Sequence, residues 1–292
     1  MKPIVRAYLE LHAAVFLFGY TAILGDLISL PAISLVWWRV LFTSLSLLFL
    51  VQVGTIAQRL SRRQIFQFIG IGAVVALHWM GFYGAIKLAN ASIALVCMAT
   101  TSLFTALLEP LLLRQPFKWL DVALSILVIP GMILVVSSLE SNMMLGVWIG
   151  LGASLLGALF SILNKKMITQ ADPFTITFLE LGSAWFFLSL LIPFYFLYTP
   201  TLKWLPIGWD WLYLLILSLV CTTLAYTLML RALKHISAFA SNLTINLEPV
   251  YGIALAWFFL QEHKELSNEF YVGVVLILLA VFSYPLFQKK GV

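Results

Sequence analysis

Charged residues are scarce in this sequence, and their scarcity indicates the class of protein before any motif is considered. Lysine, arginine, aspartate and glutamate make up 10% of the 292 residues, whereas hydrophobic residues make up 62%. A soluble globular chain carries about 25% charged residues, which keep its surface in water. The mean hydropathy of +1.03 and the long apolar runs therefore exclude a soluble protein and predict an all-α integral membrane protein.

Cysteine is almost absent, since Cys97 and Cys221 are the only two and both lie inside apolar runs. A disulfide framework or a cysteine-ligated metal site needs more thiols, so we expect neither. The histidines at positions 12, 78, 235 and 263 are not spaced as metal ligands, and the sequence has no nucleophile elbow or Walker loop. We therefore expect no enzyme activity, no cofactor and no ATP-driven pumping by this chain alone.

The sequence consists mainly of long apolar runs. A helix needs about 20 apolar residues to cross the hydrocarbon layer of a bilayer. Lys2 and Arg6 precede the first run as in a signal peptide, but no cleavage site follows, so we expect this run to be retained as a span. Ten transmembrane helices are predicted in all: 7–26, 31–53, 64–87, 91–113, 119–138, 143–164, 173–198, 210–230, 238–260 and 268–287.

The basic residues are distributed unevenly over the connections between these spans. Three lie on one side, at Lys87, Lys203 and Lys264, and Arg39 lies within the second span. Basic residues are enriched in cytoplasmic connections, so the asymmetry predicts two cytoplasmic termini in a plasma membrane of the bacterial inner-membrane type. Since the basic residues follow topology, we expect no nucleic-acid partner. The thirteen on the side of the N-terminus are Lys2, Arg6, Arg59, Arg62, Arg63, Arg114, Lys118, Lys165, Lys166, Arg231, Lys234, Lys289 and Lys290.

An ungapped shift of 147 residues superimposes parts of the two halves. Ala85-Ile86-Lys87 then falls on Ala232-Leu233-Lys234, with Lys87 outside and Lys234 inside. Five spans per half is an odd number, so the halves must insert with opposite orientation. We expect two inverted five-helix repeats, at 1–140 and 141–292, an architecture typical of transporters with a substrate site near mid-membrane.

Several segments of the second half carry a family resemblance. The run Ala232 to Ala238, continuing through Leu247-Glu248-Pro249-Val250-Tyr251 to Phe259-Leu260-Gln261-Glu262, resembles the ninth span of EamA-type transporters of the drug/metabolite transporter superfamily. The first-half copy is looser, with Ser102 in place of the proline and Gln115 in place of the glutamate. Arg39 matches the arginine common in the second span of the family, whereas Phe18-Gly19-Tyr20 departs from its first-span pattern.

This resemblance implies a fold and a class of activity. Members export or import amino acids, other metabolites and drugs. The resemblance also implies a central cavity lined mainly by spans one, three, four, six, eight and nine. The substrate and the direction of transport stay open, with export as our expectation.

Polar residues in the predicted ninth span are the first candidates for the site. Glu248 lies near its midpoint, and Pro249 removes a backbone hydrogen-bond donor, which suits a kinked helix that lines a cavity. Asn242 and Asn246 lie on the adjoining stripe. We expect Glu248 to couple the site to protons or to bind a substrate amino group, and the asparagines to bind substrate. The alternative for all three is a polar contact that holds helices together.

The fourth span has a similar polar face with Thr101, Ser102 and Glu109. We expect Thr101 and Ser102 to line the substrate site, although such hydroxyls often bond to their own helix backbone. Glu109 either lines a cytoplasmic vestibule or pairs with Arg114.

Further candidates lie in the first three spans. Arg39 is expected to pair with an acidic side chain, and Glu10 lies one turn inside the cytoplasmic face, where solvation explains it equally well. His78, Trp79 and Tyr83 are candidates for an aromatic substrate wall, although Trp and Tyr also populate membrane interfaces.

Together these features predict a transporter that moves small organic solutes by alternating access, with the proton as a candidate coupling ion. The partners are then a small-molecule substrate and the lipid bilayer, and the number of subunits is left open. The alternative is a membrane-embedded enzyme or a receptor without transport.

Overall fold

The computed structural model describes residues 3–126, 128–137, 141–199, 201, 203–245, 247–260 and 267–288, and every regular element in these ranges is helical. The elements are α1 (Pro3–Leu27), α2 (Ala32–Leu48), α3 (Val53–Arg59), α4 (Arg62–Leu88), α5 (Ala91–Ala99), α6 (Thr101–Leu113), α7 (Trp119–Ile126), α8 (Val128–Ser137), η1 (Ser141–Met143), α9 (Met144–Met167), α10 (Pro173–Tyr198), α11 (Asp210–Ser218), η2 (Leu219–Leu224), α12 (Ala225–Leu233), α13 (Ala238–Ile245), α14 (Glu248–Phe259) and α15 (Asn268–Gln288).

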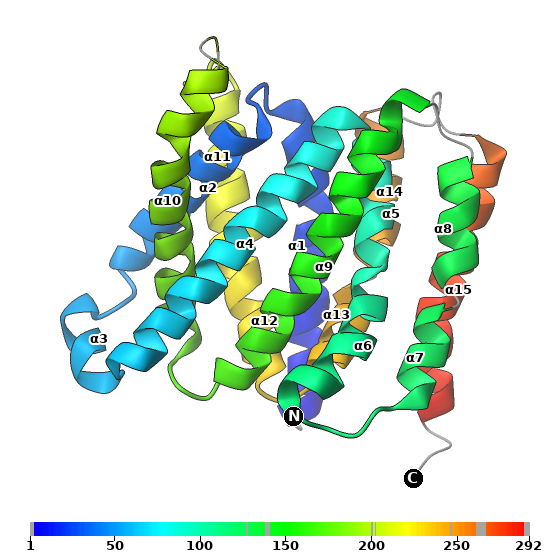
Figure 1. Ribbon diagram of the computed structural model, residues 1–292, viewed down its shortest axis with the longest axis horizontal. Helices are drawn as coiled ribbons and strands as arrows, with labels where there is room; N and C mark the ends of the chain where they lie inside the picture. Colours follow the sequence, from blue (N-terminus) through cyan, green and yellow to red (C-terminus); the bar gives the residue numbers. More distant parts are fainter. Residues whose placement is uncertain are drawn as a thin grey trace.

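The long helices lie side by side along one direction (Figure 1). Helix α4 packs against α9 and α10, and α1 packs against α12 and α14, so elements from the two halves of the sequence are interleaved. Helices α7, α8 and α15 form a group at one side of the bundle, and α2 and α10 lie at the opposite side. Helix α1 begins and α15 ends at the same end of the bundle, as an even number of crossings requires.

Among the described residues, six helices are long and apolar enough to cross a membrane, which confirms the multi-span class. Helices α2 and α3 add a seventh if they are taken as one span, although they are bent by 86° relative to each other. The expected spans 119–138 and 238–260 both include residues outside the described ranges, so the count of ten stays a prediction. The six are Pro3–Leu27, Arg62–Leu88, Ala91–Leu113, Met144–Met167, Pro173–Tyr198 and Asp210–Leu233.

Polar side chains at the chain reversals cap the N-termini of several of these helices. Ser61 and Gln64 form a capping box at the start of α4, each accepting a backbone hydrogen bond from the other. Asn90 accepts a hydrogen bond from the Ile93 amide at the start of α5. Asp172 caps α10 directly before Pro173. These caps satisfy amides that have no partner within the first helical turn.

The basic connections gather at one end of the bundle. The junctions between α3 and α4, between α6 and α7 and between α9 and α10 lie at the end where α1 begins (Figure 1). Arg59 at the end of α3, Arg114 directly after α6 and Lys165 in the last turn of α9 lie at these junctions. At the opposite end, Lys87 donates hydrogen bonds to the carbonyls of Asp26 and Ile28. This sorting agrees with the charge asymmetry of the sequence, while the membrane face that each end occupies stays a prediction.

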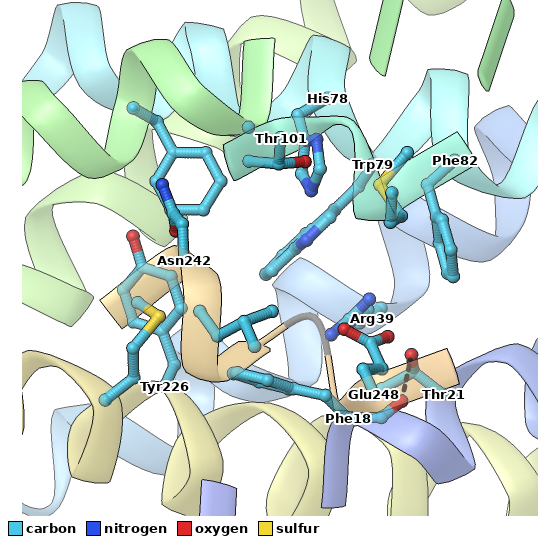
Figure 2. Close-up of a pocket in the computed structure, with 15 residues that line it drawn as sticks. Phe18, Thr21, Arg39, His78, Trp79, Phe82, Thr101, Tyr226, Asn242 and Glu248 are labelled. Atoms are coloured by element: carbon cyan, nitrogen blue, oxygen red, sulfur yellow. Dashed lines mark hydrogen bonds between the residues drawn. The ribbon is translucent and has the colours of Figure 1, made fainter. Parts of the chain in front are cut away.

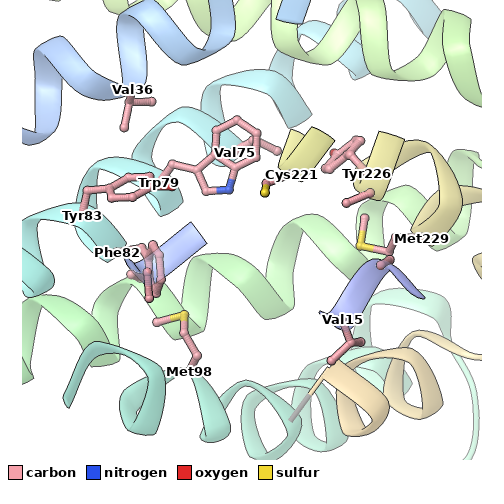
Figure 3. Close-up of a cluster of buried hydrophobic side chains, with 14 of the residues drawn as sticks. Val15, Val36, Val75, Trp79, Phe82, Tyr83, Met98, Cys221, Tyr226 and Met229 are labelled. Atoms are coloured by element: carbon pink, nitrogen blue, oxygen red, sulfur yellow. The ribbon is translucent and has the colours of Figure 1, made fainter. Parts of the chain in front are cut away.

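Aromatic and sulfur-containing side chains fill the centre of the bundle (Figure 3). Trp79 and Tyr226 are in edge-to-face contact, with ring centroids 6.3 Å apart, and they come from opposite halves of the sequence. Close helix contacts depend on glycine. A Cβ atom at Gly72 of α4 would collide with the carbonyl oxygen of Glu180 and the hydroxyl of Ser183 in α10. Small residues at such contacts let membrane helices approach closely.

The orientation can be tested by labelling single cysteines at Ser141 and Arg62 with a membrane-impermeant reagent on intact cells. We expect a cysteine at position 141 to be labelled from outside and a cysteine at position 62 to be protected, because basic connections stay in the cytoplasm. The parent chain is the control, because Cys97 and Cys221 are both buried. Labelling at position 62 from outside would overturn the orientation.

The close contact at Gly72 can be tested against Gly70 on the same helix. Gly72→Ala should lower the free energy of unfolding by about 1–3 kcal/mol, since the added methyl group overpacks the contact with α10. Gly70→Ala should change stability by about 1 kcal/mol or less, because nothing lies near its Cβ position and alanine favours helix. The measurement is thermal unfolding in detergent, and equal effects would contradict the packing argument.

Candidate functional site

A cavity at the centre of the bundle is the candidate site (Figure 2). The space there that protein atoms do not occupy, open solvent included, is about 660 Å³. Most of its wall is aromatic or aliphatic, with polar groups at a few positions. The lining residues are Phe18, Thr21, Arg39, His78, Trp79, Phe82, Met98, Thr101, Gly157, Phe160, Tyr226, Met229, Asn242, Ile245 and Glu248.

These residues come from both halves of the sequence. They lie on α1, α4, α5, α6, α9, α12, α13 and α14, which correspond to the six spans that the resemblance implies. Arg39 on α2 adds the second span to the wall. The cavity is therefore formed only when the two halves pack together.

Arg39 is the cation of the cavity wall, and only 2% of its surface is exposed. Its Nε donates a hydrogen bond of 2.7 Å to Thr222 Oγ1, and its Nη1 donates one of 2.7 Å to Tyr83 Oη. The guanidinium carbon lies 3.8 Å from the ring centroid of Trp79. Stacking and hydrogen bonding of this kind stabilise a buried guanidinium.

The hydrogen-bond partners of Arg39 are not the acidic side chain that was expected to pair with it, although Glu248 attracts it electrostatically. Within the part of the chain that the structure describes, its hydrogen bonds go to neutral hydroxyl groups. Thr222 lies in the π-helical turn η2, where its own hydroxyl also bonds to the carbonyl of Leu217 five residues earlier. This local widening of the helix has no signature in the sequence, and it places the Thr222 side chain in reach of α2.

Glu248 supplies the carboxylate of the cavity wall, with 7% of its surface exposed. Its carboxylate points toward the guanidinium of Arg39, which attracts it electrostatically (Figure 2). The residue is the first of α14, and α13 ends at Ile245, so the expected ninth span is interrupted beside the acid. Pro249 lies in the first turn of α14, where a missing amide costs no intrahelical hydrogen bond. Asn246 lies outside the described residues.

Asn242 and Thr101 also lie on the cavity wall. The side-chain amide of Asn242 donates a hydrogen bond of 2.8 Å to Thr105 Oγ1, which ties α13 to α6. The hydroxyl of Thr101 is 2.9 Å from that of Ser154 on α9. Ser102 is not among the described lining residues, and its hydroxyl bonds to the Ala99 carbonyl of its own helix.

The three aromatic candidates of the third span have different positions. His78 and Trp79 line the cavity, and the Nδ1 atom of His78 lies 2.7 Å from the carbonyl oxygen of Ala153. Tyr83 is fully buried beside the Arg39 guanidinium and is not among the residues that line the cavity in the described chain. It therefore supports the site rather than lining it.

The two other acidic candidates lie away from the cavity. Both carboxylate oxygens of Glu109 accept hydrogen bonds from backbone amides at the start of α13, 3.1 Å from Ala238 N and 2.7 Å from Phe239 N. Glu109 is thus a buried helix cap in this structure rather than a partner of Arg114. Glu10 forms ion pairs with Arg6 and Arg231, at 2.9 and 2.7 Å.

Sequence reasoning missed most of the apolar wall. Phe18, Phe82, Phe160 and Met229 have no distinguishing signal, because apolar residues occupy nearly every position of every span. Tyr226 had a detectable signal, as a hydroxyl-bearing residue deep in the eighth span. Which apolar residues face a cavity rather than lipid depends on how each helix is rotated in the bundle.

An all-helical chain with several apolar spans and a partly polar cavity at its centre has the architecture of a membrane carrier. The model of the EamA-like transporter family matches residues 6–137 and again residues 144–284, so the chain belongs to that family. Its members are membrane transporters of small solutes. The match of one model to both halves also shows that the chain contains two repeats.

A solved structure titled "Crystal structure of protein" has the same fold. The two chains superpose with a TM-score of 0.68 over 97% of this chain and 98% of the other, at 15% sequence identity. Identity this low supports the fold and not the substrate. Comparison with curated proteins gave no match.

The structural role of Arg39 can be tested by Arg39→Ala. We expect it to lower the free energy of unfolding by about 3–5 kcal/mol, because Glu248 then lies buried without its neighbouring cation. Adding Glu248→Gln should restore part of the lost stability, while Arg39→Lys should restore little, since an ammonium cannot reproduce the stacked, forked geometry. Thermal unfolding of the purified variants measures each effect. Wild-type stability of Arg39→Ala would contradict a structural role.

Proposed function

We propose that this protein moves small zwitterionic solutes across the membrane, amino acids with an apolar or aromatic side chain being the simplest. The observation that carries the proposal is the composition of the cavity wall. One guanidinium, Arg39, and one carboxylate, Glu248, lie on a wall that is otherwise mostly aromatic and aliphatic.

The charges of the cavity support a zwitterion. Arg39 and Glu248 together bring no net charge, so a ligand with one positive and one negative group leaves the buried site neutral. The carboxylate of such a ligand is attracted to Arg39 and its ammonium to Glu248. Asn242 and Thr101 add polar groups on the same wall. An ion of single charge would leave an uncompensated charge in a medium of low dielectric constant.

The apolar part of the wall supports a ligand with a hydrophobic side chain. Trp79, Phe82, Phe160 and Met98 line the cavity and offer aromatic faces and a polarisable sulfur atom. Aromatic rings pack against such faces in edge-to-face or offset geometry. A fully polar solute would have to displace water from this surface without replacing its hydrogen bonds.

We further propose alternating access between two inverted five-helix repeats, at 1–140 and 141–292. Contacts between the repeats at both ends of the bundle support this mechanism. At the end where α1 terminates, Asp210 accepts hydrogen bonds of 2.9 and 2.7 Å from the amide and hydroxyl of Ser29. At the other end, Glu109 holds the start of α13. Breaking one contact while keeping the other would open the cavity to one side at a time.

The direction we propose is export, with both termini in the cytoplasm of a bacterial-type plasma membrane and the proton as coupling ion. The basic residues at the end where α1 begins support the cytoplasmic termini.

The role of Glu248 can be tested in liposomes that contain only this protein, with radiolabelled L-phenylalanine as the probe. Glu248→Gln should raise the KM about 10- to 100-fold, because a charge-assisted hydrogen bond to the ammonium contributes about 1.5–3 kcal/mol. The change keeps the shape of the side chain, so folding should be spared.

Glu269→Gln is the matched control, since this carboxylate is exposed at the start of α15. It should transport like the wild type. Wild-type flux and affinity in Glu248→Gln would leave Glu248 as a helix-packing residue, and absence of flux in the wild type would remove this class of substrate.

A further inference from the structure

A second carboxyl group lies behind the cavity wall, on α10 about two turns after its first residue, Pro173. Glu180 has 0% of its surface exposed. Its Oε2 accepts a hydrogen bond of 2.5 Å from Tyr226 Oη and one of 3.2 Å from the side-chain amide of Asn164. That same amide lies 3.3 Å from Tyr226 Oη, so the three side chains form one closed cluster between α9, α10 and α12. No donor within the described chain reaches Oε1.

The described residues of the neighbouring helices bring no cation to this cluster. Helix α4 places Gly72, which has no side chain, against the backbone of Glu180. The titratable groups deeper in α4 are turned elsewhere, His78 to the carbonyl of Ala153 and Tyr83 to Arg39. Arg39, the cation of α2, is bound to Tyr83 and Thr222.

The remaining basic residues on the packed helices lie at the ends of the bundle. Arg231 of α12 pairs with Glu10. Lys165 of α9 donates to the carbonyls of Leu233 and Ile236. The others on these helices are exposed, namely Arg62, Arg63, Lys87 and Lys166.

A carboxylate in this position would be a buried negative charge with two neutral donors and no counter-ion. Removing an unpaired charge from water is costly, and a carboxyl group avoids that cost by binding a proton. Glu248 differs in its surroundings, because its carboxyl group points toward the guanidinium of Arg39. We propose that Glu180 is the proton-binding site through which this transporter is coupled to a proton gradient. This inference rests on the proposed transport function and assigns its coupling ion to a residue.

Tyr226 connects the proposed proton-binding site at Glu180 to the substrate cavity. Its ring lines the cavity, stacked on Phe160 with centroids 6.4 Å apart, while its hydroxyl binds Glu180. It lies across the cavity from Arg39 and Glu248 (Figure 2). A solute that displaces the Tyr226 ring therefore changes the hydrogen bonding of Glu180, which links substrate occupancy to protonation.

The proton step itself is simple. When α12 moves relative to α10 and water reaches the cluster, the O–H bond of the Glu180 carboxyl breaks. The proton passes to a water molecule in the cavity, and the bonding electrons stay on the carboxylate, which Tyr226 and Asn164 continue to hold. Reprotonation from the opposite side completes the cycle.

Infrared difference spectroscopy tests the site without any solute. Wild-type protein in lipid, shifted between acidic and alkaline buffer, should show the C=O band of a protonated carboxyl that disappears in Glu180→Gln. The band should persist in Glu248→Gln. Loss of the band in Glu248→Gln and its persistence in Glu180→Gln would overturn the assignment. Tyr226→Phe serves as a second variant that keeps the acid: it should shift the band, because a hydrogen bond to the carboxyl is lost.

Transport measurements test the coupling, again with L-phenylalanine. In Glu180→Gln, exchange of labelled for unlabelled solute at equal pH should continue, whereas accumulation driven by a pH gradient and solute-induced proton movement, followed with pyranine, should be lost. Glu269→Gln should retain all three. Gradient-driven accumulation in Glu180→Gln would overturn the proposal. If the wild type does not move L-phenylalanine, the proposed solute fails, while the infrared result still decides the proton site.

Discussion

Burial of one guanidinium group organises the centre of this protein. A charge buried within a membrane protein is costly unless neighbouring groups compensate it, so Arg39 needs partners from the surrounding helices. Tyr83 comes from α4, Thr222 from the π-helical turn η2 and Trp79 from α4. A single side chain of α2 therefore contacts helices from both repeats.

The cost of burying an unpaired polar group also explains why the remaining polar side chains occur in small groups whose members are hydrogen-bonded to one another. Asn242 bonds to Thr105, Thr101 lies beside Ser154, and Glu109 accepts two backbone amides. Each set joins elements that are far apart in sequence. Hydrophobic burial between helices is weak in lipid, so these hydrogen bonds and the close glycine contacts carry much of the helix association.

The two buried acids, Glu248 and Glu180, have different surroundings. Glu248 lies at the interruption between α13 and α14, on the cavity wall and opposite a cation. Glu180 lies within an unbroken helix, behind the wall and among neutral donors. The first environment places a carboxyl group opposite a guanidinium on the wall that a solute would contact, and the second surrounds a carboxyl group with neutral donors. Separate residues for solute and proton allow the two to be bound at the same time.

Sequence alone was sufficient for the class of protein, for the family and for the sorting of basic residues to one end of the bundle. These properties depend on local composition and on short motifs, which do not need a neighbour. It also singled out Glu248, Asn242, Thr101, His78 and Trp79, which do line the cavity, because polar or aromatic residues in an apolar span are conspicuous.

Only the tertiary structure shows which polar side chains contact one another. The neutral neighbours of Arg39, the capping role of Glu109 and the cluster of Glu180 with Tyr226 and Asn164 join residues on different helices. The apolar lining of the cavity could not be predicted from the sequence either, since nothing in the sequence distinguishes Phe160 from a phenylalanine that faces lipid. Such contacts depend on the rotation and spacing of whole helices, and an apolar sequence leaves that rotation undetermined because almost every face of the helix is compatible with lipid.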